Sequence, residues 1–181
     1  RQRDEVRRAK EEAERAKAID AKVPVKTVLR EGNIYDDIGT VAKEIGAELI
    51  IMGTHGMRGM QFITGSRALR VITNSTVPFI VVQERGLKAD GYRDIVVPMD
   101  LQRETRQKLG LVADMAAYFK SKAHVIVPKE SDEFLHKQLK DNITFAKKYF
   151  GERGIAMEAI VTDAGSGGFV DAVLDYSKKI D

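Results

Sequence analysis

Short apolar runs alternate with stretches of helical periodicity along the sequence, and this order constrains the fold more than any other feature. Leu49–Met52 is a continuous apolar run, which is typical of a parallel strand covered on both faces. Over 132–150, apolar residues instead recur every three or four positions, as on one face of a helix. The same patterns predict helices over 3–20, 34–45, 68–72, 103–120, 132–150 and 170–174, and strands over 25–29, 49–52, 79–82, 95–97, 124–127 and 156–161. Alternating strands and helices predict an α/β fold with a parallel open sheet, right-handed crossovers and helices on both faces.

Charge and composition exclude several classes of function. The chain has 30 basic and 27 acidic residues in 181, a formal net charge of +3. The basic residues of segment 1–20 are mixed with acidic ones, which is typical of a solvated helix face, so we expect no nucleic-acid partner. No apolar run approaches the roughly 20 residues that span a bilayer, so we expect no membrane insertion. The absence of cysteine fits a reducing compartment, and we expect a cytoplasmic location.

A glycine-rich segment follows the predicted strand 49–52. Glycine lets a phosphate approach the backbone closely, and a helix N-terminus adds free N–H donors and partial positive charge. In open α/β sheets ligands bind at the carboxyl ends of strands. The segment therefore predicts a phosphate-binding loop, with a purely structural tight turn as the alternative. Its candidate residues are Gly53, Thr54, His55 and Gly56 after the strand, and Gly65 and Ser66 at the start of the next helix.

The sequence does not assemble a catalytic or metal site. His124 begins a predicted strand and His136 lies on a charged helix, and neither has a second ligand at metal-binding spacing or an obvious nucleophile partner. We therefore predict no catalytic and no metal-ligating residues. Any hydrolysis of a ligand bound by the phosphate loop would be slow and incidental.

Four segments of the chain resemble the universal stress protein family. They are Ile50–Gly56, Gly65–Ser66, Val77–Val82 and Ile95–Asp100. The last is similar to the family's first strand, which ends in an aspartate. The resemblance implies a flavodoxin-like (Rossmann-type) sheet in the order 3-2-1-4-5, pairing of modules or a homodimer through the last strands, and a role in stress response.

In one subclass the resemblance also implies ATP binding, with Mg²⁺ only if ATP is bound. Gly53, Gly56, Gly65 and Ser66 then match positions that hold phosphates and ribose. Thr54 and His55 lie within the same loop, and His55 could contact a phosphate or simply face solvent. Asp100 matches the acidic residue at the nucleoside end, and could equally cap the helix that follows it. Val127 lies near the position that contacts adenine.

One spacing departs from the ATP-binding pattern. That pattern places nine residues between the second glycine and the Gly-Ser pair, whereas Gly56 and Gly65 enclose eight. Loss of one residue shifts the loop relative to the helix start, and binding contacts tolerate only about half an ångström of displacement. Two functions follow: an adenine-nucleotide-binding module, and a nucleotide-free scaffold that acts by strand-mediated dimerisation.

The order of elements predicts parts of two modules. A strand, a glycine turn and a helix that ends near Ile45 form one set of elements. The same set recurs about 135 residues later, where its helix ends near Ile180. We expect 1–83 to be the C-terminal part of a first module, 84–92 a linker, and 93–181 the N-terminal part of a second. The two parts could complete one composite sheet, or the polypeptide could be longer at both ends.

Overall fold

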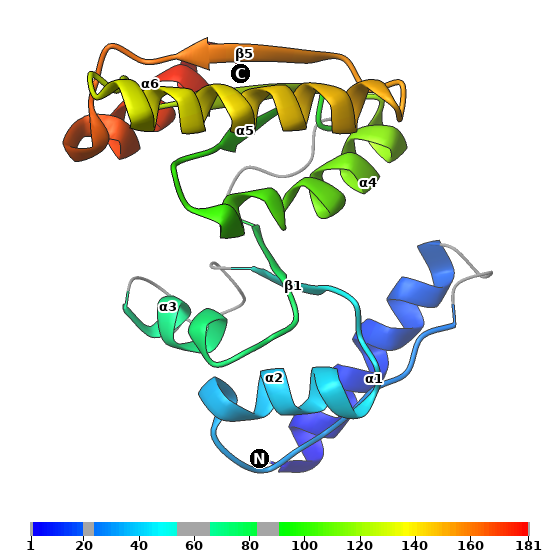
Figure 1. Ribbon diagram of the computed structural model, residues 1–181. Coiled ribbons are helices and arrows are strands. Elements are labelled where there is room, and N and C mark those ends of the chain that lie inside the picture. Colours follow the sequence, from blue (N-terminus) through cyan, green and yellow to red (C-terminus); the bar gives the residue numbers. More distant parts are fainter. Residues whose placement is uncertain (1, 20–23, 54–65, 83–90, 181) are drawn as a thin grey trace. The chain divides into compact units, whose positions relative to one another are not determined.

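The computed structural model describes residues 2–19, 24–53, 66–82 and 91–180 (Figure 1). The chain divides into two compact units, Arg1–Gly86 and Leu87–Asp181, which we call unit 1 and unit 2. Each combines parallel strands with helices, which confirms the α/β fold class. The division falls within segment 84–92. That each unit is part of a stress-protein module stays a prediction, as does the composite sheet.

Unit 1 contains one small parallel sheet. Strand β1 pairs with β2, and Ile50 lies opposite Phe79. The buried core around this sheet consists of Met52 and Val71, among the side chains that the structure describes. The elements of unit 1 are α1 (Gln2–Ile19), α2 (Ile34–Glu44), β1 (Ile50–Gly53), α3 (Ser66–Thr73) and β2 (Phe79–Val82).

The strand expected over 25–29 is absent. Residues 24–31 have no regular secondary structure, and the side chains of Val28 and Leu29 are 56% and 48% exposed. A strand is stable only when a neighbour accepts its backbone hydrogen bonds. In the described part of unit 1, β1 and β2 pair with each other and 25–29 has no such neighbour. The prediction of a strand over 25–29 is therefore wrong for the residues that the structure describes.

Unit 2 contains a three-stranded parallel sheet in the order β3-β4-β5. Val97 lies opposite Val125, and Val125 lies opposite Ala159. The helix expected over 103–120 is divided into a short 3₁₀ turn and an α-helix. The complete order 3-2-1-4-5 stays a prediction. The elements of unit 2 are β3 (Asp94–Pro98), η1 (Arg103–Arg106), α4 (Leu109–Phe119), β4 (Lys122–Val127), α5 (Glu133–Gly151), β5 (Met157–Val161), η2 (Ser166–Gly168) and α6 (Phe169–Ile180).

The core of unit 2 lies between one face of this sheet and helices α4 and α5. Alternate strand residues point to opposite faces, so Val125 and Val127 face this core while His124 and Ile126 face the other side. Helix α6 covers that other side, where its Tyr176 contacts His124. In Figure 1 the long helix α5 runs alongside β5. The core cluster consists of Val97, Met99, Leu109, Ala113, Ala116, Ala123, Val125, Val127, Leu139, Ala146, Phe150 and Ile155.

Within the described residues, no helix has both the length and the apolar character needed to cross a membrane.

Candidate functional site

The two predicted nucleoside residues lie at the carboxyl end of the sheet in unit 2. β3 ends at Pro98, which is opposite Ile126 on β4, and the Met99 backbone N–H donates to the Ile126 carbonyl at 2.9 Å. Asp100 therefore follows β3 at the edge where Val127 ends β4. Ligands of parallel sheets bind at this edge. The structure thus brings together the ends of the strands that carry Asp100 and Val127.

The environment of each residue limits how it could contact a ligand. The Asp100 Oδ1 atom accepts a hydrogen bond from the Gln102 backbone N–H at 2.9 Å, so this carboxylate already organises the turn after β3. The Val127 side chain is 1% exposed and belongs to the core cluster. The Val127 carbonyl also accepts a hydrogen bond from the Thr162 backbone N–H at 3.0 Å, so neither the side chain nor this carbonyl is free for an adenine ring.

Two further polar side chains hold the turn after β3. The Asn142 amide on α5 donates to the Asp100 carbonyl at 2.8 Å, and its oxygen accepts from Arg106 Nε at 2.9 Å. Lys108 donates from Nζ to the Pro98 carbonyl at 2.7 Å. Burial lowers the pKa of Lys108 below its ordinary value, and the charge of Asp100 partly opposes that shift. The turn that carries Asp100 is therefore fixed to both α4 and α5.

The predicted phosphate loop begins in unit 1, again at the carboxyl end of a parallel sheet. β1 ends at Gly53, opposite Val82 at the end of β2, and α3 begins at Ser66. Thr54, His55, Gly56 and Gly65 lie outside the described residues. The structure therefore places the strand end and the helix start on either side of the loop, as the sequence predicted, and leaves the contacts of the loop as a prediction.

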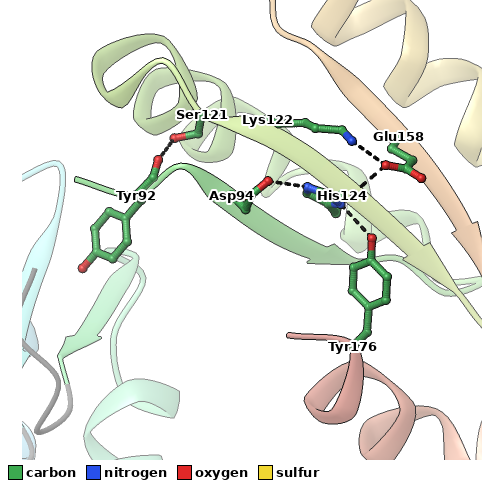
Figure 2. Close-up of polar contacts among 7 residues, drawn as sticks. All are labelled: Tyr92, Asp94, Ser121, Lys122, His124, Glu158 and Tyr176. Atoms are coloured by element: carbon green, nitrogen blue, oxygen red, sulfur yellow. Dashed lines mark hydrogen bonds and ion pairs between the residues drawn. The ribbon is translucent and has the colours of Figure 1, made fainter. Parts of the chain in front are cut away.

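A different polar cluster lies at the amino end of the sheet in unit 2 (Figure 2). The His124 side chain is 5% exposed. Its Nε2 atom lies 2.6 Å from Asp94 Oδ1, and its Nδ1 atom lies 2.8 Å from the Tyr176 hydroxyl on α6. Glu158 Oε2 lies 3.9 Å from Nδ1 and 2.5 Å from Lys122 Nζ. We call these five residues the His124 cluster.

The geometry of the sheet explains how these side chains meet. His124 on β4 lies directly opposite Glu158 on β5 and Val96 on β3. Asp94 and Lys122 are opposite each other, two positions earlier, so they share the same face of the sheet. Helix α6 then brings Tyr176 over that face from 52 residues away in the chain.

Hydrogen bonding and burial shift the pKa values of three members of the His124 cluster. The hydrogen bond between Lys122 and Glu158 raises the pKa of Lys122 and lowers the pKa of Glu158. Burial raises the pKa of Tyr176, and the nearby charge of Glu158 raises it further. These shifts keep Glu158 ionised and the Tyr176 hydroxyl protonated near neutral pH.

Sequence reasoning did not find this cluster. The sequence predicts no catalytic or metal role for His124, because no partner is close to it along the chain. Asp94 and Tyr176 are 30 and 52 residues away. The available signal was the buried position of His124 within an apolar strand, since a buried imidazole needs hydrogen-bond partners. Over the residues that the structure describes, no group of three or more His, Cys, Asp or Glu side chains could hold a metal ion.

The described strands and helices define an α/β protein with parallel sheets. Comparison with family models gives a match to the universal stress protein family over residues 1–83. That segment spans the described strands and helices of unit 1. Comparison with curated proteins gives no match. That unit 2 is a second module of the same family stays a prediction.

Proposed function

We propose that this protein is an adenine-nucleotide-binding stress-response module that acts through binding and pairing rather than catalysis. The observation that carries the proposal is the strand–loop–helix arrangement of β1 and α3, within the segment that matches the universal stress protein family. Glycine stands at the end of the strand, at Gly53, and serine at the start of the helix, at Ser66. The preferred ligand is ATP, accompanied by Mg²⁺ when bound.

The phosphate end of the ligand would lie at the loop of unit 1. Backbone N–H groups of Gly53, Thr54, His55 and Gly56, together with the first turn of α3, would supply donors to phosphate oxygens. Gly65 and the Ser66 hydroxyl would hold the phosphate or the ribose. These are binding roles: none of these residues would transfer a proton to the ligand or form a covalent bond with it.

The nucleoside end needs residues of the kind found at the carboxyl edge of unit 2. Asp100 would accept hydrogen bonds from ribose hydroxyls through the carboxylate oxygen that does not bond Gln102, and the strand end at Val127 would lie near adenine. The phosphate loop belongs to unit 1 and Asp100 to unit 2, so separate variants test the two sets of residues.

Titration with a fluorescent ATP analogue, with Mg²⁺ and with a chelator, tests the proposal. We expect saturable binding that Ser66→Ala and Asp100→Asn each weaken by about tenfold, the size of one charge-assisted hydrogen bond. Ser131→Ala and Asp141→Asn remove the same groups from exposed positions of unit 2 and should bind as the parent does. Absence of a saturable signal below about 1 mM would refute nucleotide binding.

The alternative function is a nucleotide-free scaffold that acts by strand-mediated dimerisation. The eight-residue spacing between Gly56 and Gly65 favours it, and so does the exposure of Ile51 on β1, at 65%. Sedimentation velocity with and without ATP distinguishes the two functions. A concentration-dependent dimer whose formation is the same with and without ATP supports the scaffold. A dimer that forms only with ATP supports the nucleotide-binding module.

A further inference from the structure

The His124 cluster fixes the proton position of a buried imidazole. An ionised carboxylate can only accept hydrogen bonds, so the short contact to Asp94 requires the hydrogen of neutral His124 to be on Nε2. The Nδ1 atom then has a lone pair and accepts the hydrogen bond donated by the Tyr176 hydroxyl. In this state His124 links β3 to α6 through its two ring nitrogens.

Glu158 offers a second partner to the same nitrogen. Its Oε2 atom lies 3.9 Å from Nδ1 and is held by Lys122. A neutral Nδ1 is an acceptor and gains nothing from a carboxylate. A protonated Nδ1 is a donor, and a carboxylate is a stronger acceptor for it than a phenol oxygen. Protonation of Nδ1 therefore changes its preferred hydrogen-bond partner from Tyr176 to Glu158.

Helix α6 is the element most sensitive to that choice. None of its residues is fully buried, and the side chains of Val170 and Leu174 are 70% and 50% exposed. Phe169, Val173 and Ile180 of the same helix are only partly buried, and the Tyr176–His124 hydrogen bond adds a polar attachment of α6 to β4. Water can deliver the proton, because the Asp94 and Glu158 side chains are 35% and 50% exposed.

We propose that the His124 cluster is a pH-sensitive latch, in which protonation of His124 transfers Nδ1 from Tyr176 to Glu158 and loosens α6 from the sheet. The charged and titratable groups that face the ring are Asp94 on β3, Lys122 on β4, Glu158 on β5 and Tyr176 on α6. Without the extra proton, Asp94, Glu158 and Lys122 sum to one negative charge, and the imidazolium neutralises it. Histidine is the side chain that ordinarily changes charge between about pH 5 and 8, and this sets the range over which the latch is tested.

Hydrogen exchange of α6 amides tests the latch, with rates corrected for the intrinsic effect of pH. We expect exchange in α6 to be about three- to tenfold faster at pH 5 than at pH 8, the range that loss of one hydrogen bond gives. Amides of α5 serve as the internal reference. His136→Gln, which removes an exposed histidine on α5, should leave the acid response of α6 unchanged.

Two variants separate the latch from general acid destabilisation. Tyr176→Phe removes the hydroxyl, and α6 should then exchange at the fast rate at both pH values. Glu158→Gln replaces the competing carboxylate with a weaker acceptor, and the acid response should shrink. An unchanged α6 in the parent protein, or a full acid response in both variants, would overturn the proposal. Neither variant touches the nucleotide-binding edge, so the result is independent of ATP binding.

Discussion

Units 1 and 2 share an α/β design but differ in how deeply their strands are buried. In unit 2, every residue of β4 from Ala123 to Val127 is buried, because β4 has a strand on each side and helices on both faces. In unit 1, β1 has the same kind of apolar sequence, yet Ile51 is 65% exposed and only Met52 is buried among its four residues. The apolar pattern of a strand therefore indicates that its burial would be favourable. The neighbouring strands and helices determine how much of its surface is actually buried.

The difference also corrects an expectation. The run Leu49–Met52 predicted a strand covered on both faces, but Ile51 is 65% exposed while Met52 on the opposite face is buried. In the described part of unit 1, β1 also has one strand neighbour, β2. A two-stranded sheet is marginally stable by itself. We therefore expect unit 2 to be the more stable unit, and the following experiments test that comparison.

The largest effect should come from the core of unit 2. Phe150 on α5 is fully buried, and Phe150→Ala should lower the free energy of unfolding by about 3–5 kcal/mol. Phe134→Ala, on the same helix but at a side chain that is 68% exposed, should change it by less than about 0.5 kcal/mol. Chemical denaturation followed by circular dichroism measures both. Equal losses in the two variants would contradict the core assignment.

The corresponding change in unit 1 should be smaller and local. Met52→Ala should destabilise unit 1 by about 2 kcal/mol, the lower end of the range for such truncations, because few buried neighbours surround this side chain. Native-state hydrogen exchange of β1 and β2 amides should show the loss. Ile51→Ala is the matched control one residue away and should be nearly neutral. If Met52→Ala destabilised β4 amides as strongly, the two units would be one cooperative body.

Helix caps allow an equal perturbation of both units. Asn33 caps α2 by accepting from the Tyr35 N–H, and Asp132 caps α5 by accepting from the Leu135 N–H. Replacing either by alanine should cost about 1 kcal/mol. In unit 2 the loss should appear in the cooperative unfolding transition, whereas in unit 1 it should appear as faster exchange confined to α2. The reverse pattern would show that unit 1 is the more cooperative unit.

The smallest effect concerns alkaline pH. The raised pKa of Tyr176 means that the unfolded chain loses this proton first, so its stabilisation of unit 2 is present below the ordinary tyrosine value of 10.0 and is lost as pH rises through the folded value. Tyr176→Phe should flatten the fall in stability between pH 9 and about 11, measured by denaturation at each pH. Tyr118→Phe, at a side chain that is 81% exposed, should keep the slope of the parent.

Much of the secondary structure could be predicted because each element carries its own local signal. The periodicity over 132–150 corresponds to α5, and the run 79–82 to β2. The strand expected over 25–29 failed because pairing depends on a neighbour that a local pattern does not contain. The strand ends at Gly53, Pro98 and Val127 could be predicted for the same reason, since they are contiguous with recognisable strands. The nucleotide site that they would carry stays a prediction.

The sequence by itself determined the α/β class, the position of most helices and strands, and the resemblance of segment 1–83 to universal stress proteins, because these depend on patterns within about 20 consecutive residues. Only the tertiary structure decided that β4 is buried and β1 exposed. It also decided that Asp94, His124, Glu158 and Tyr176 form one cluster. These residues come from three strands and a helix, and parallel pairing sets which side chains face each other. No local pattern encodes that register, because it is fixed when the strands and α6 pack together.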